Sequence, residues 1–331
     1  MNDALSTVLQ RARVEAAFFS RALGTAPWGV ETRGAATGIF HVVVRGQATL
    51  RADGRSVTVN AGELVVLPGG IPHVLADPPT AAATWIGALP RVDAPLPTVV
   101  AGCGQPVGAS AGEPVGEPIG EPIGEPVGEP ETEILCGTLR FGPLGQELLL
   151  AHLPPVLHAR GPALGAWVTV LAGELRAHPP GADAVASCLG QLLFLLALRE
   201  WLDASQTPGW LAGLTHPDIG KALAMVQAAP AEDWSVDRLA RRCALSRSVF
   251  CERFTAVVGE PPAAWVTRWR MIVARELLED PDRGIAEVAA AVGYASEAAF
   301  HRAFKRAVGQ PPARWRRGPD EPGPRGSGSD R

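Results

Sequence analysis

Several signatures that would assign a chain of this length to a common enzyme class are missing. The sequence contains no Walker phosphate loop and no Gly-x-Gly-x-x-Gly dinucleotide fingerprint. Its 331 residues include five cysteines, an odd number for a disulfide framework, so we expect reduced thiols. Charged Arg11, Glu15 and Arg21 interrupt the apolar pattern of residues 1–24, which predicts an amphipathic helix instead of a secretory signal.

Long hydrophobic runs are also scarce. The most apolar run extends from Val185 to Leu198 and includes Ser187, Gly190 and Gln191. A helix that crosses a bilayer needs about 20 apolar residues, so we expect no membrane partner and a cytoplasmic location. A helix that is apolar on nearly every face must be covered, either by its own domain or by a second copy of the chain.

Charge is divided unevenly along the chain. The formal net charge is −4. Residues 212–317 carry 16 Lys+Arg and 12 Asp+Glu, whereas the remainder carries 14 and 22. A basic C-terminal part attached to an acidic N-terminal part favours nucleic acid as the partner of the C-terminal part.

Residues 36–76 are typical of short β-strands separated by glycine turns. Asp53-Gly54 is a characteristic two-residue hairpin turn. Runs rich in β-branched residues cover 39–44, 48–52, 57–59 and 63–67. A further strand is expected over residues 133–141, and helices are expected over about 162–177 and 183–203. The pattern predicts a small barrel or sandwich with flanking helices.

Three segments lack the patterns of packed structure. Gly-Glu-Pro recurs every four residues within 112–130, so residues 105–131 are expected to form a disordered loop inserted in the first domain. Residues 205–215 are expected to be a linker, and residues 318–331 a disordered tail. The predicted domains are therefore 1–204 and 216–317.

Two stretches near the C-terminus repeat each other. The pattern Phe-x-x-x-Phe-x-x-x-Val-Gly-x-Pro-Pro-Ala-x-Trp begins at Phe250 and again at Phe300. Each copy follows an apolar helical stripe and a turn, with Ser246 or Ser296 placed to cap the second helix. A connecting helix over about 263–279 spans roughly 25 Å. It can hold two recognition helices about one duplex turn apart.

The segment from about His216 to Arg317 resembles the DNA-binding domain of AraC/XylS-type transcription regulators. The resemblance extends through both units, the connecting helix and the closing Val-Gly-x-Pro-Pro-Ala-x-Trp. It implies a regulator that reads two successive major grooves of promoter DNA and works with RNA polymerase. Whether it acts as an activator or a repressor is left open.

Burial of the phenylalanine stripe leaves the opposite faces of the recognition helices for DNA. Arg302 suits the two acceptors of guanine, and Lys305 and Arg306 suit phosphates. Glu252 stands where the family often has Arg, so it either accepts from a cytosine amino group or is repelled by phosphate. The full set of expected contacts is Arg247, Ser248, Cys251 and Glu252 in the first unit, and Glu297, Ala298, His301, Arg302, Lys305 and Arg306 in the second.

The N-terminal part carries a second resemblance. Gly62-(five residues)-Pro68-x-Gly70-x-x-His73 is similar to the second cupin motif, and the context of Cys136 also resembles this regulator subgroup. The resemblance implies a cupin-like jelly roll that senses a ligand. We therefore predict an α+β chain of two domains, a cupin-like β-barrel with flanking helices followed by an all-α tandem helix-turn-helix.

His41, His73, Cys103 and Cys136 are the candidates for an effector or metal pocket. Imidazole and thiolate groups suit zinc, but the same residues fit satisfied pocket histidines and small buried thiols. Oxidation of Cys103 and Cys136 to a disulfide is a third interpretation, if their α-carbons come within about 7 Å.

The leading hypothesis is a transcription regulator, not an enzyme, controlled by a small ligand, metal or oxidant acting on the N-terminal domain. Pairing of two copies is left open. One alternative is a cupin metalloenzyme fused to a DNA-binding module, but residues 40–42 are Phe-His-Val and lack the His-x-His of that class. Another is an architectural DNA protein, which would show little sequence preference and a steep salt dependence.

Overall fold

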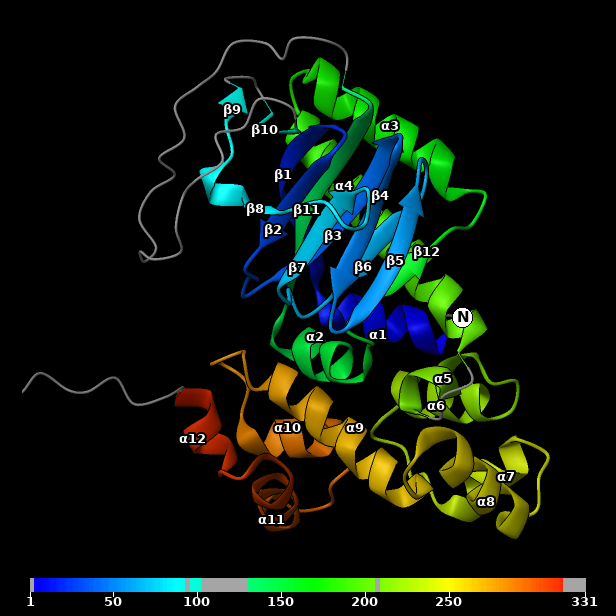
Figure 1. The fold of residues 1–331 in the computed structure, drawn as a ribbon. Coiled ribbons are helices and arrows are strands. Elements are labelled where there is room, and N and C mark those ends of the chain that lie inside the picture. The colour runs from blue at the N-terminus through cyan, green and yellow to red at the C-terminus, as the bar shows by residue number, and fades with distance from the viewer. Residues whose placement is uncertain (1–2, 93–95, 103–129, 206–208, 318–331) are drawn as a thin grey trace, which may run out of the picture. The chain divides into compact units, whose positions relative to one another are not determined.

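The computed structural model describes residues 3–92, 96–102, 130–205 and 209–317 (Figure 1). These residues form two compact units. One contains residues 9–205 and all of the described β-structure, and the other contains residues 3–8 and 209–317 and is helical. Most of the predicted disordered loop, the predicted tail and Cys103 lie outside the described residues.

Two sheets build the larger unit (Figure 1). The first has the strand order β12-β6-β3-β11-β1-β10-β9, and the second has the order β5-β4-β7-β2-β8. Their apolar side chains, Leu50, Val65 and Ile134 among them, form one buried core, which confirms the predicted cupin-like barrel. The strands are β1 (Val14–Thr25), β2 (Trp28–Thr32), β3 (Gly38–Arg45), β4 (Gln47–Ala52), β5 (Arg55–Asn60), β6 (Leu64–Leu67), β7 (His73–Asp77), β8 (Thr84–Trp85), β9 (Arg91–Val92), β10 (Thr98–Gly102), β11 (Thr132–Phe141) and β12 (Leu157–Ala159).

The strands predicted from the sequence are confirmed in the structure. β3, β4, β5, β6 and β11 each begin and end within two residues of the predicted runs. Asp53 and Gly54 form the predicted hairpin turn, since Ala52 of β4 pairs with Arg55 of β5 and both turn residues have positive φ. This is the backbone conformation that Asp-Gly favours.

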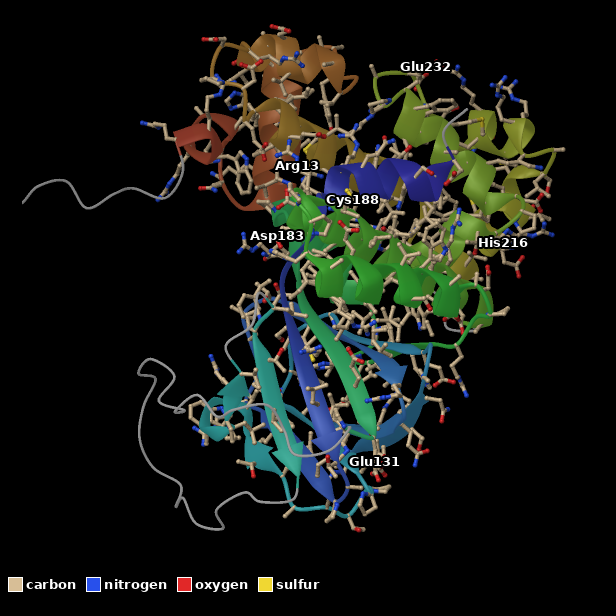
Figure 2. The ribbon with its side chains drawn as sticks, turned by 90° about the horizontal axis from the view of Figure 1, so that it is seen from above. Arg13, Glu131, Asp183, Cys188, His216 and Glu232 are labelled. Atoms are coloured by element: carbon tan, nitrogen blue, oxygen red, sulfur yellow. The ribbon has the colours of Figure 1, made fainter. Side chains whose placement is uncertain are left out.

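The prediction of a helix over residues 1–24 is confirmed only for residues 4–12 and is wrong for the residues that follow. Helix α1 (Ala4–Ala12) is followed at once by β1, and Arg13, which separates them (Figure 2), has a φ of 44° that a helix does not admit. β1 pairs with β11 on one side and with β10 on the other. Ladder pairing on both edges and burial of Phe19 and Leu23 outweigh the weak helical periodicity.

Helices cover the first sheet of the cupin unit. They are α2 (Pro143–Leu148), α3 (Leu164–Ala177) and α4 (Ala182–Ala204), with short 3₁₀ turns at Ile86–Ala88 and Leu150–His152. α4 lies against β1 and β12 and buries Leu193, Phe194 and Leu198. Contrary to our expectation from the apolar run, α4 has 23 residues and by length and composition alone could cross a membrane. In the structure 44% of that apolar window is buried.

The second unit is built from helices α5 (Trp210–Thr215), α6 (Ile219–Ala228), α7 (Val236–Arg242), α8 (Arg247–Val258), α9 (Pro262–Leu277), α10 (Ile285–Ala291), α11 (Glu297–Val308) and α12 (Pro312–Arg317). α9 is the predicted connecting helix. α5 falls within residues 205–215, where we expected only a linker. Trp210, Leu211 and Leu214 are buried there, and α5 packs against α6 and α8, so this segment belongs to the helical unit.

Candidate DNA interface and barrel cluster

The duplication in the sequence is a duplication in space. α7 and α8 form one helix-turn-helix unit, and α10 and α11 form the other. In the first, the ring centroids of Phe250 and Phe254 are 5.6 Å apart and Phe254 is 6.3 Å from Trp265. The matching distances among Phe300, Phe304 and Trp315 are 5.5 and 6.5 Å. All four phenylalanines are at most 1% exposed, so each recognition helix is anchored by the same aromatic wedge.

Serine caps begin both recognition helices, as predicted, and glycines end them. The Ser246 hydroxyl accepts a hydrogen bond from the Val249 amide at 3.4 Å, and the Ser296 hydroxyl accepts one from the Ala299 amide at 3.3 Å. Gly259 and Gly309 end the helices with φ of 88° and 83°, where a β-carbon would be strained. Both helices therefore begin and end at corresponding residues.

Most of the predicted contact residues on α8 and α11 are exposed. Arg247, Ser248, Glu252, Glu297, Ala298, Arg302, Lys305 and Arg306 are exposed, and Cys251 and His301 are half-buried. Val249 of α8, which was not among the predicted contacts, is also 40% exposed.

The two recognition helices differ in whether their basic side chains form ion pairs. In the first unit the Arg247 guanidinium lies 3.1 Å from the Asp237 carboxylate of α7, and Arg253 lies 2.6 Å from Asp218. In the second unit the side chains of Arg302 and Lys305 form no hydrogen bond or ion pair with any part of the chain that the structure describes. The second unit thus presents uncommitted positive charge, whereas the first presents cations already shared with carboxylates.

Three of the four predicted pocket residues meet inside the barrel. His41 comes from β3, His73 from β7 and Cys136 from β11. The Nε2 atoms of His41 and His73 are 2.8 Å apart, and His41 Nδ1 is 2.9 Å from Cys136 Sγ. The fourth residue, Cys103, lies outside the described residues, so the predicted Cys103–Cys136 redox pair remains a prediction.

The hydrogen bonds of this cluster fix its protonation pattern. The carbonyl of Ile71 can only accept, so His73 carries its proton on Nδ1, at 2.9 Å from that oxygen. Nε2 of a neutral His73 must then accept from His41 Nε2–H, which leaves His41 Nδ1 to accept from the Cys136 thiol. The result is one directed chain from thiol to carbonyl in which every group is neutral.

Burial maintains this neutral state. It lowers the pKa of His41 well below its ordinary value, with a further lowering from the neighbouring His73, and it lowers the pKa of His73. Burial also raises the pKa of the Cys136 thiol to about 12. A thiol held protonated is a weak nucleophile, so Cys136 acts here as a hydrogen-bond donor.

The described residues do not arrange the cluster as a metal site. His41 directs one nitrogen to Cys136 and the other to His73, so its two partners lie on opposite edges of the ring. Among the described residues no group of three or more His, Cys, Asp or Glu side chains could hold a metal ion. A zinc set that includes Cys103 extends beyond these residues and stays a prediction.

Comparison with known proteins places both units in families. A family model described as "Cupin" matches residues 3–203, and one described as "Helix-turn-helix domain" matches residues 239–318. A putative AraC-like transcription regulator of Streptomyces lividans is 37% identical over 196 residues, which is 57% of this chain and 64% of the relative. The chain thus spans less than two thirds of the length of that relative.

Two further relatives have related names. The RCS-specific HTH-type transcriptional activator RclR of Escherichia coli (strain K12) is 33% identical over 192 residues, covering 56% of this chain and 68% of the relative. The HTH-type transcriptional regulator MtrA of Neisseria gonorrhoeae is 25% identical over 287 residues, covering 85% of this chain and 86% of the relative. All three are named as transcription regulators and none as an enzyme. This chain belongs to the AraC/XylS family of transcription regulators that carry an N-terminal cupin domain.

Proposed function

We propose that this chain is a sequence-specific transcription regulator whose helices α8 and α11 enter two successive major grooves of promoter DNA in the cytoplasm. The observation that carries the proposal is the matched pair of helix-turn-helix units, each with a buried aromatic wedge and an exposed polar face. In such units the second helix contacts base edges while backbone phosphates fix its register.

The two helices have different roles in this proposal. Arg302 donates to the two acceptors of a guanine, and Lys305 and Arg306 neutralise phosphates. In the first unit, Val249 contacts a thymine methyl group, and Glu252 accepts from a cytosine amino group. Base preference is thus spread over both helices, whereas the salt dependence of binding comes mostly from α11.

Selection of bound genomic DNA by the full chain, followed by affinity measurements over a range of salt concentrations, tests this function. Regulator-type binding gives one enriched motif and a logarithmic salt slope of roughly −0.9 for each phosphate contacted. Equal affinity for the enriched site and for random competitor would instead support an architectural DNA protein.

Control by an effector is supported by a pocket at one end of the barrel. It has a cavity volume of about 490 Å³, and its lining includes His73, Thr32, Arg51, Arg55 and Ser56. Because His73 also belongs to the buried His41–Cys136 chain, a ligand in this pocket would lie beside one end of that chain. His73→Asn should leave DNA binding intact without effector and abolish its change on effector addition.

Pairing of two copies is supported by the outer faces of α3 and α4. Trp167, Val170 and Val185 are 40%, 48% and 43% exposed, and the exposed face of α3 from Ala166 to Gly173 carries no charge. A face without charge does not repel a second copy of itself. Trp167→Glu should lower the molar mass measured by analytical ultracentrifugation if this face joins two copies. We further propose that DNA-bound dimers engage RNA polymerase.

A further inference from the structure

The two helix-turn-helix units are joined by a side chain as well as by a helix. Arg270 lies in the middle of α9, and its guanidinium contacts both the segment before α7 and the turn before α11. α9 packs against α6 and α8 of the first unit and against α10 and α11 of the second. A contact away from the axis of α9 adds to the restraint on rotation of one unit relative to the other.

On the side of the first unit, Arg270 binds backbone. Its Nε donates to the Pro230 carbonyl at 2.9 Å and its Nη2 donates to the Glu232 carbonyl at 2.8 Å. The same segment, which includes Glu232 (Figure 2), is closed by the Trp234 indole, whose Nε1 donates to the Ala229 carbonyl at 2.7 Å. The segment that Arg270 binds is thus also held by hydrogen bonds to the Ala229 carbonyl, from the Trp234 indole and from the Glu232 amide.

On the side of the second unit, Arg270 meets the turn between α10 and α11. Its guanidinium carbon is 5.8 Å from the ring centroid of Tyr294, which packs edge-on against Phe300 of the aromatic wedge at 5.7 Å. Gly293 has a φ of 81°, and a β-carbon there would lie 2.7 Å from the Ala231 carbonyl oxygen and 2.8 Å from Arg270 Nη2. The turn of the second unit thus touches the segment before the first unit with no room for a side chain.

We infer that Arg270 is a positioning residue that locks α8 and α11 in one relative orientation, so that the protein itself sets the spacing between the two base sequences it recognises. The Arg270 guanidinium uses two N–H groups to bind the carbonyls and its flat face to contact the Tyr294 ring, and a lysine ammonium cannot make both contacts. One added base pair moves a half-site by about 3.4 Å along the duplex and rotates it by about a tenth of a turn. A locked module cannot follow that change, whereas a loosened one can.

Arg270→Lys tests the inference by spacing discrimination, which rests on the proposed function. The wild-type full chain should lose about tenfold or more in affinity when one base pair is added between the half-sites, because the second unit no longer contributes its effective concentration. Arg270→Lys should bind the optimal site more weakly, lose about threefold or less on the same insertion, and keep wild-type affinity for each isolated half-site. A merely structural defect would lower half-site affinity as well.

Arg268→Lys is the matched control. Arg268 lies two residues away on α9, and its Nε donates to Glu260 at 2.8 Å, a contact that does not reach the second unit. This variant should discriminate spacings like the wild type. Gly293→Ala offers an independent variant with Arg270 intact, since its added β-carbon forces the same contact apart.

A measurement without DNA separates this inference from the proposed function. Genetically encoded spin labels at the exposed positions Thr255 and Ala307 report the distance between α8 and α11 by pulsed electron resonance. The wild type should give one narrow distance distribution, and Arg270→Lys and Gly293→Ala should each broaden it, whereas Arg268→Lys should not. Equal widths in all four proteins, or wild-type spacing discrimination in Arg270→Lys, would overturn the inference.

Discussion

The carboxylate of Asp237 should restrain DNA binding by the first unit. Its ion pair with Arg247 has an N–O distance of 3.1 Å, and the two side chains are 55% and 67% exposed. An exposed pair of this kind contributes about 0.2–1 kcal/mol. Arg247 must give up that contact before it can bind DNA, and Asp237 then remains unpaired next to phosphates. Asp237→Asn should therefore raise affinity for the preferred site, by up to about fivefold for each 1 kcal/mol released.

Substitutions in the second unit should change DNA affinity more, because no carboxylate of the described chain pairs with Arg302. Loss of a bidentate guanine contact costs about 1–3 kcal/mol, or roughly 5- to 150-fold in affinity. Arg302→Ala should thus weaken binding more than Arg247→Ala, and it should relax base preference at a single position. Arg247→Ala in the Asp237→Asn background should cost more than it does in the wild type.

Fluorescence anisotropy with the selected site, at one fixed salt concentration, measures all of these affinities. Thermal unfolding of each variant controls for stability, since Asp237 lies in the first turn of α7 and interacts favourably with the helix dipole. The reasoning is refuted if Asp237→Asn weakens binding while leaving the unfolding temperature unchanged. It is equally refuted if Arg247→Ala costs more than Arg302→Ala.

Three further outcomes follow from packing and protonation. Phe300→Ala should lower the free energy of unfolding of the helical unit by about 3–5 kcal/mol, because the ring is fully buried. Calorimetry that resolves the unfolding of this unit measures the loss. An unchanged transition would contradict the role of the aromatic wedge in anchoring α11. Ser296→Ala should lower the free energy of unfolding by about 1 kcal/mol in urea, through loss of the helix cap. The cupin unit should lose stability as the pH falls below about 6.5. In the folded chain the lowered pKa values keep His41 and His73 neutral there, whereas in the unfolded chain both histidines become protonated. The free energy of unfolding should change with pH by up to about 1.4 kcal/mol per pH unit for each proton bound, and this dependence should be weaker in the double variant His41→Gln/His73→Gln. A stability that rises toward acid pH would contradict the neutral state of these histidines.

The helical unit was largely predictable because its determinants are local. Ser246, Ser296, Gly259 and Gly309 are cap residues whose roles depend on neighbours in sequence, and the phenylalanine spacing fixes which face is buried. The ion pairs of α8 were not predictable. Asp237 and Arg247 lie on different helices, and their contact depends on the angle between those helices.

The N-terminal unit shows where local patterns end. Residues 14–25 have an ambiguous pattern, and only pairing with β11 and β10 makes them a strand. His41, His73 and Cys136 were chosen by residue type and motif, and the barrel does bring them together. Their arrangement as a chain, with His41 in the middle, depends on ring orientations that follow from packing and from the Ile71 carbonyl.

Hydroxyl-radical footprinting of the full chain on its selected site is the most direct test of two recognition helices acting on one duplex. The account predicts two protected segments about 10 base pairs apart on the same face of the DNA, with protection of the α11 segment lost in Arg302→Ala at limiting protein. A single protected segment, or uniform protection that does not depend on sequence, would contradict it.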